Sequence, residues 1–128
     1  MTHLVGFWET LREERALKRA KRENRNVLIR KYKTGKVWRF WEWHVTIMWS
    51  VACSDGKVRY VEEEITTDSL RDPRLTYLNK DKEIPEWVND EIENQIKIEK
   101  GLTTREEIEK KKEEFIKALG FELVYKGV

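Results

Sequence analysis

The feature that most constrains the fold is a run of alternating residues from position 41 to position 53. Every second residue in this run is apolar, and three of these residues are tryptophan. The residues between them are mostly small or polar. A period of two is typical of a β-strand that buries one face. The apolar face comprises Trp41, Trp43, Val45, Ile47, Trp49, Val51 and Cys53.

An aromatic stripe of this kind is either the centre of a core or a surface for a partner. Each aromatic side chain that becomes buried removes about 150–250 Å² from water. We expect Trp43 and Trp49 in the core, where such stripes usually lie. Six tryptophans are many for 128 residues, and interfaces are enriched in tryptophan. Trp8, Trp41 and Trp87 are therefore candidate residues of a homodimer interface.

The stretch from Lys36 to Cys53 is too long for one straight strand. It would span about 60 Å, whereas a globule of this length has a radius of gyration of about 14 Å. A β-bulge at Phe40–Trp41, or a break into two strands, would resolve this conflict. Upstream, residues 26–33 have strand character, and Thr34–Gly35 is predicted to be a hairpin turn.

The segment Ser54–Lys57 contains an Asp-Gly pair between two strand-like runs. This pair favours a two-residue type I′ hairpin loop. The expected register places Cys53 opposite Val58 and Val51 opposite Tyr60, so that apolar residues meet.

The whole chain is predicted to be one α+β domain with an antiparallel β-meander. A helix over about residues 10–24 is favoured by strong helix formers without proline. Thr103 with Glu106, or Thr104 with Glu107, forms a capping box for the last helix. The expected segments are a basic N-terminal helix (1–25), a Trp-rich meander of three strands (26–66), a loop (67–84), an αα-hairpin (85–119) and a final strand (121–126).

The charge of the chain is unevenly distributed. Residues 1–40 contain 12 Lys and Arg against 4 Asp and Glu, whereas the remaining residues contain 14 against 20. Clustered cations bind nucleic-acid phosphates, and aromatic side chains beside them stack on bases. The alternative is a solvated surface, or pairing with the acidic run Glu62–Glu64. The candidate nucleic-acid-binding residues are Lys18, Arg19, Arg22, Arg25, Arg30, Lys33, Trp38 and Arg39.

Signals for catalysis are weak. Glu42 and His44 share one strand face and could form an acid–base pair, but no nucleophile accompanies them. Glu62 and Glu64 with Asp55 could hold Mg²⁺, which makes a metal-dependent hydrolase a remote alternative. Cys53 is expected to be a small apolar core residue. The glycines are isolated, so no nucleotide-binding loop is expected, and we predict no catalytic residue, metal or cofactor.

The sequence has neither a signal-peptide pattern nor a long apolar run, which predicts an intracellular protein without a membrane partner. The single cysteine fits a reducing compartment such as the cytoplasm. Abundant Lys, Arg and Glu with a single glutamine suggest a thermophilic, archaeal or viral source. The favoured function is a non-enzymatic module that contacts DNA or RNA, largely independently of sequence, through the basic helix and first hairpin. The alternative is a homo-oligomeric structural or protein-interaction module that uses the Trp-rich sheet.

Overall fold

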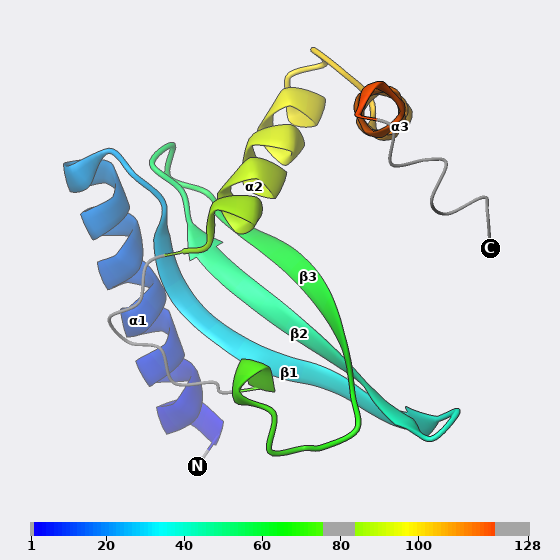
Figure 1. Ribbon diagram of the computed structural model, residues 1–128. Coiled ribbons are helices and arrows are strands. Elements are labelled where there is room, and N and C mark those ends of the chain that lie inside the picture. Colours follow the sequence, from blue (N-terminus) through cyan, green and yellow to red (C-terminus); the bar gives the residue numbers. More distant parts are fainter. Residues whose placement is uncertain (1, 76–83, 120–128) are drawn as a thin grey trace. The chain divides into compact units, whose positions relative to one another are not determined.

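The computed structural model describes residues 2–75 and 84–119, with side chains from residue 6 onward. Within these ranges the chain is α+β, as predicted, with one three-stranded antiparallel sheet (Figure 1). The final strand predicted at 121–126 lies outside the described residues. The elements are α1 (Thr2–Glu23), β1 (Val27–Arg39), β2 (Glu42–Ala52), β3 (Val58–Thr67), the 3₁₀-helix η1 (Pro73–Leu75), α2 (Glu86–Glu99) and α3 (Arg105–Ala118).

The chain divides into two compact units, residues 1–89 and 90–128. The first unit holds α1, the sheet, η1 and the start of α2, and the second holds the rest of α2 and α3. Each unit is described by itself below.

Helix α1 begins at Thr2, within the predicted segment 1–25 but eight residues before the run of strong helix formers near Thr10. It ends where predicted, because Asn24 adopts a left-handed conformation with φ 51°. The Arg25 N–H then donates to the Ala20 carbonyl at 3.1 Å. This six-to-one hydrogen bond is the Schellman motif that commonly ends helices.

The first hairpin turns at Phe40–Trp41, so the prediction of a turn at Thr34–Gly35 is wrong. Strand β1 runs through Thr34–Gly35, where the β1–β2 register shifts between Lys33 and Gly35. The pairing instead continues to Arg39 and Glu42. The long stretch is thus broken into two strands, which was one of the two predicted solutions. The break resolves the length conflict, since β1 and β2 each fit within the sheet.

The second hairpin is a three-residue loop, and the predicted two-residue loop is wrong by one residue of register. Ala52 pairs with Val58, and Val51 pairs with Arg59. The Gly56 N–H donates to the Cys53 carbonyl at 3.0 Å, and the Cys53 N–H donates to the Lys57 carbonyl at 2.9 Å. Gly56 has φ 90°, which matches a turn closed by a glycine bulge. An Asp-Gly pair suits a hairpin loop of two or three residues. In the three-residue loop that is observed, Arg59 forms an ion pair with Asp55.

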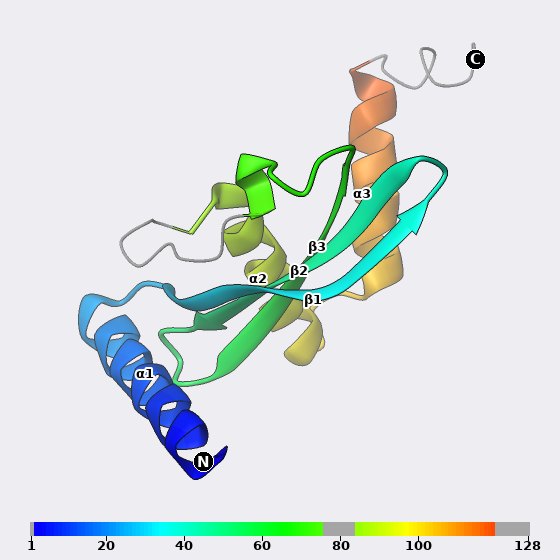
Figure 2. The same ribbon diagram turned by 90° about the horizontal axis from the view of Figure 1, so that it is seen from below.

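The two faces of the sheet are covered differently. Helix α1 lies along the face near the start of β1 and the end of β2 (Figure 2), where Ala16 and Ala20 pack against Val27 and Ala52. The opposite face carries the predicted apolar stripe, and Val45, Ile47 and other residues of β2 are fully buried there. Small alanines on α1 let the helix approach the sheet closely.

Trp49 is buried in the core on the apolar face, as predicted, whereas Trp43 is only half-buried. The Trp49 side chain is 6% exposed, and its ring meets the edge of Trp87 from α2 at a centroid distance of 6.0 Å. The indole N–H donates to Glu63 Oε2 at 2.9 Å, which satisfies the polar atom of a buried tryptophan. The Lys31 ammonium lies 4.7 Å from the Trp49 ring centroid and donates to the Arg74 carbonyl in η1 at 2.9 Å.

In the second unit the predicted helix signals are confirmed. Gly101 has φ 73° and follows the end of α2, while the Leu102 N–H donates to the Lys97 carbonyl at 2.9 Å. Thr104 caps α3 by accepting from the Glu107 N–H at 3.2 Å. Arg105 pairs with Glu91 at 2.8 Å. In the described parts of the chain, no helix has the length and apolarity that a membrane span requires.

Candidate nucleic-acid interface

The first hairpin ends in a cluster of exposed aromatic and basic side chains, here called the hairpin tip (residues 36–41). Phe40 is 79% exposed and Trp41 is 85% exposed. Val37 and Trp38 are also largely exposed. Large apolar side chains held in water are costly unless they serve a contact. The hairpin tip is therefore the strongest candidate for a binding surface in the described part of the first unit.

The backbone of the turn is unusual for the residues that form it. Phe40 has φ 52° and Trp41 has φ 64°, so both occupy the left-handed region of a type I′ turn. That turn is normally made by Asn and Gly. A left-handed conformation costs an L-residue roughly 1–2 kcal/mol. Residues kept in such conformations cluster at functional sites.

Trp38 is held on the apolar face of the sheet by the strand register. It pairs with Trp43 across β1 and β2, and the two rings meet edge to face at a centroid distance of 5.1 Å. The Lys36 ammonium lies 5.2 Å from the Trp43 ring centroid. This packing fixes Trp38, while 48% of its surface stays exposed.

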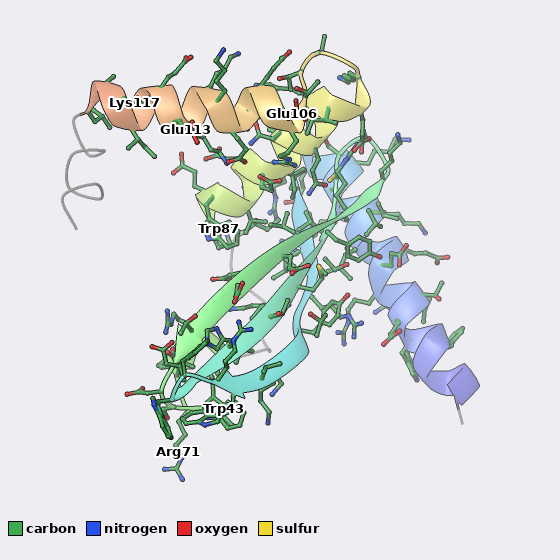
Figure 3. The ribbon with its side chains drawn as sticks, turned by 90° about the vertical axis from the view of Figure 1, so that its right-hand side faces the viewer. Trp43, Arg71, Trp87, Glu106, Glu113 and Lys117 are labelled. Carbon is green, nitrogen blue, oxygen red and sulfur yellow. The ribbon has the colours of Figure 1, made fainter. Side chains whose placement is uncertain are left out.

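The cations of the hairpin tip are available to a ligand. The Arg39 guanidinium lies 5.8 Å from the Phe40 ring centroid. Among the described residues, neither Lys36 nor Arg39 has a carboxylate partner. Arg71, in the segment after β3, is exposed and lies at the same end of the sheet as Trp43 (Figure 3). Lys36 and Arg39 thus place positive charge beside the rings of Trp43 and Phe40, and Arg71 is a further exposed cation at this end of the sheet.

The predicted arginines at the end of α1 converge on one carboxylate. Glu23 accepts from Arg19 Nε at 2.7 Å and from Arg25 Nε at 2.9 Å. Arg22 lies 3.7 Å from the same carboxylate. The hydrogen bond from Arg19, then that from Arg25, lowers the pKa of Glu23. Pairing with Glu62–Glu64, the alternative from the sequence, does not involve these arginines.

The other predicted basic residues lie between these two clusters or on the surface of α1. Arg30 lies 3.3 Å from Glu9, and its guanidinium stacks 4.0 Å from the Tyr32 ring centroid. Lys18 and Lys33 are exposed.

The structure therefore does not bring all predicted phosphate-binding residues together. The arginines of α1 precede β1, and Trp38 and Arg39 end it, so they lie at opposite ends of the sheet (Figure 1). The 13 residues of β1 span about 40 Å at about 3.3 Å per residue. The basic end of α1 and the hairpin tip are two separate surfaces.

The three predicted interface tryptophans also lie at separate places. Trp8 is 62% exposed on α1 and meets Phe7 edge to face at 5.4 Å. Trp41 belongs to the hairpin tip. Trp87 packs against Trp49 within the same chain, and 44% of it remains exposed.

The predicted pair of Glu42 and His44 acquires a third member from β3. His44 Nε2 lies 3.8 Å from Glu42, and Nδ1 lies 3.6 Å from Glu64. Both imidazole nitrogens are buried without a hydrogen-bond partner. The three side chains form a cluster on the polar face of the sheet, where Thr66 of β3 is the cross-strand partner of His44.

The three carboxylates of the predicted hydrolase site are not assembled. Asp55 forms a two-pronged pair with Arg59, at 3.0 and 2.8 Å, in the loop between β2 and β3. The hydrogen bond from Arg59 lowers the Asp55 pKa to about 2. Glu64 lies opposite Thr46, far along β3 from that loop. Within residues 2–75 and 84–119, no group of three His, Cys, Asp or Glu side chains is arranged to hold a metal ion.

Lys36 and Phe40 lie in the basic and aromatic stretch that is evident in the sequence, and the change of parity at Phe40–Trp41 predicts the bulge or break there. Arg71 was not predicted from the sequence. Arg71 follows β3 by several residues, and only the tertiary fold relates it to the hairpin tip.

Comparison of the chain with protein-family models, with curated proteins and with solved structures finds no match.

Proposed function

We propose that this chain is a non-enzymatic module that binds nucleic acid, largely independently of sequence, chiefly through the hairpin tip. The observation that carries this proposal is the interleaving of exposed rings with cations that have no carboxylate partner. Lys36 and Arg39 alternate with Val37, Trp38 and Phe40 along the chain. Phosphates bind to such cations, and bases stack on such rings.

The chemistry of the hairpin tip also supports low sequence specificity. Reading base edges requires hydrogen-bonding groups such as Asn, Gln or bidentate Arg presented to a groove. Residues 36–41 contain one arginine and no Asn, Gln, Ser or Thr. Contacts to phosphates position a ligand without reading its sequence.

The basic end of α1 has a secondary role in this proposal. Its arginines share Glu23, so part of their charge is already neutralised. The length of β1, whose 13 residues have a contour of about 40 Å, separates them from the hairpin tip, so they act as a separate, weaker phosphate contact.

The test is a salt titration with fluorescently labelled oligonucleotides. Replacing Lys36 and Arg39 with Gln should weaken binding about tenfold or more at low salt. It should also lower the slope of log K against log salt by about 1.4, because each phosphate contact to a single strand contributes about 0.7. Replacing Lys110 and Lys111 on α3 with Gln removes the same charge and is the matched control. Equal effects of the two double substitutions would contradict the proposal.

A second candidate is a homo-oligomeric module, which the exposed pair Phe7 and Trp8 favours. Their rings form a small apolar patch on α1, and apolar association is not screened by salt. Light scattering across a concentration series distinguishes the two candidates. Association that persists in high salt and is lost in Trp8→Ala would support this second function.

A further inference from the structure

We infer that the ligand of the hairpin tip is a single strand, and that Trp38, Phe40 and Trp41 are its stacking platforms. This inference rests on the proposed function and names its substrate class. It follows from the placement of the rings, from the fixed backbone of the turn and from the cost of inserting rings into a duplex.

The rings are presented at the apex of the hairpin rather than along a flat face. Phe40 and Trp41 are the two central residues of the turn, between the last β1–β2 pair of Arg39 and Glu42. Both side chains extend beyond the paired strands, with most of their surface in water. Stacking on a base requires an open ring face, and these side chains provide one.

The backbone of the turn is closed by the cross-strand pair of Arg39 and Glu42. It is bounded by strand pairing on both sides, and Trp38 is fixed by Trp43 at 5.1 Å. Because the platforms need little rearrangement, less conformational entropy is lost on binding.

An unpaired base is the ligand that these rings accept most readily. Stacking one base on an aromatic side chain strengthens binding by about 5- to 150-fold. In a duplex the bases are already stacked on one another. An inserted side chain must first separate two neighbouring base pairs, which costs free energy. In a groove the hairpin tip has only Lys36 and Arg39 to compensate this cost by hydrogen bonds to base edges. A single strand is therefore preferred over a duplex.

The number of rings sets the size of the site. Three platforms accommodate about three to four nucleotides, at roughly one base per ring. Lys36 and Arg39 lie beside Trp43 and Phe40, within reach of the phosphates between stacked bases. The site tolerates deoxyribose and ribose, since the aromatic and cationic contacts involve bases and phosphates.

The experiment compares anisotropy titrations with oligothymidylate, oligouridylate and a mixed-sequence duplex, each of about twelve residues per strand, at low salt. The test variant is the double substitution Phe40→Asn and Trp41→Gly, which keeps residues suited to the turn. Trp8→Ala removes an exposed ring elsewhere and is the matched control. Circular dichroism establishes that each variant is folded.

We expect both single strands to bind at least about tenfold more tightly than the duplex. The double substitution should weaken single-strand binding about tenfold or more and leave duplex binding nearly unchanged. Equal binding of strands and duplex, unaffected by this substitution, would overturn the inference and leave the electrostatic function standing. Absence of binding to all three polymers would overturn the proposed function itself.

Discussion

The turn at Phe40–Trp41 leads to a prediction of unusual sign: removing its two aromatic side chains should not destabilise the protein. The perturbation is the double substitution Phe40→Asn and Trp41→Gly. Left-handed backbone at φ 52° and 64° costs roughly 1–2 kcal/mol for each L-residue. Gly has no such cost and Asn a reduced one in a type I′ turn, so this substitution relieves at most about 2–4 kcal/mol.

The burial that is lost is small. Phe40 and Trp41 are 79% and 85% exposed, so each hides only about 40 Å² of its surface. At about 25 cal/mol per Å², the two side chains together lose about 2 kcal/mol. This figure is an upper bound, because unfolded chains are partly compact. The net change is between about zero and 2 kcal/mol in favour of the folded state.

Urea unfolding followed by far-UV circular dichroism measures this change without relying on tryptophan emission, which the substitution alters. Gly56→Ala is the reciprocal control. Gly56 has φ 90°, and nothing lies within 4 Å of an added Cβ. Its cost is therefore conformational, roughly 1–2 kcal/mol of destabilisation. A loss of more than about 1 kcal/mol in the double variant would refute the reasoning, since it would mean that the rings stabilise the fold.

Three further predictions concern the core, the loop and the basic helix end. Ile47→Ala in the buried stripe should lower the free energy of unfolding by about 3 kcal/mol in urea titrations, whereas Val37→Ala at the exposed tip should change it by less than about 1 kcal/mol. Because Arg59 lowers the Asp55 pKa from 3.8 to about 2, this pair stabilises the fold above about pH 4 and is lost as the pH falls toward 2. The pH-dependent contribution of this pair to the free energy of unfolding is about 1 kcal/mol, because solvent screens the Asp55 side chain, which is 42% exposed. The difference in the free energy of unfolding between wild type and Asp55→Asn, measured in urea titrations, should therefore decrease as the pH falls from about 4 to about 2. Glu23→Gln should release Arg19 and Arg25 and raise oligonucleotide affinity at low salt by about 2- to 5-fold; unchanged affinity would mean that the end of α1 makes no phosphate contact.

Much of the fold could be predicted from local chemistry. The alternation in β2, the capping box at Thr104 and the helix end at Gly101 each depend on neighbouring residues alone. The structure confirms the strand, the helix end and the N-cap half of the box at Thr104, while the Glu107 carboxylate accepts from the Thr103 hydroxyl.

The two turns could not be predicted correctly, for different reasons. Phe40–Trp41 lacks the Gly or Asn that type I′ turns normally use, so Thr34–Gly35 was the stronger signal. Asp55–Gly56 fits loops of two or three residues equally well. The structure has the three-residue loop, in which the Arg59 guanidinium pairs with the carboxylate of Asp55 four residues earlier.

The candidate site was predicted in composition but not in arrangement. The basic character of residues 18–39 is evident from the sequence, as is the aromatic character of Trp38 and its neighbours. The separation of the basic residues into two surfaces follows from the length of β1. Arg19 meets Glu23 one helical turn away, and the left-handed residue Asn24 brings Arg25 back to the same carboxylate.

The central claim is that unpaired bases contact the apex of the first hairpin. Photocrosslinking of the wild-type protein to a single strand carrying 5-iodouracil tests it most directly, because this base reacts with aromatic rings in contact with it. After tryptic digestion and mass spectrometry, the account predicts adducts on Phe40 or Trp41. Adducts confined to Phe7, Trp8 or other residues of α1 would contradict it.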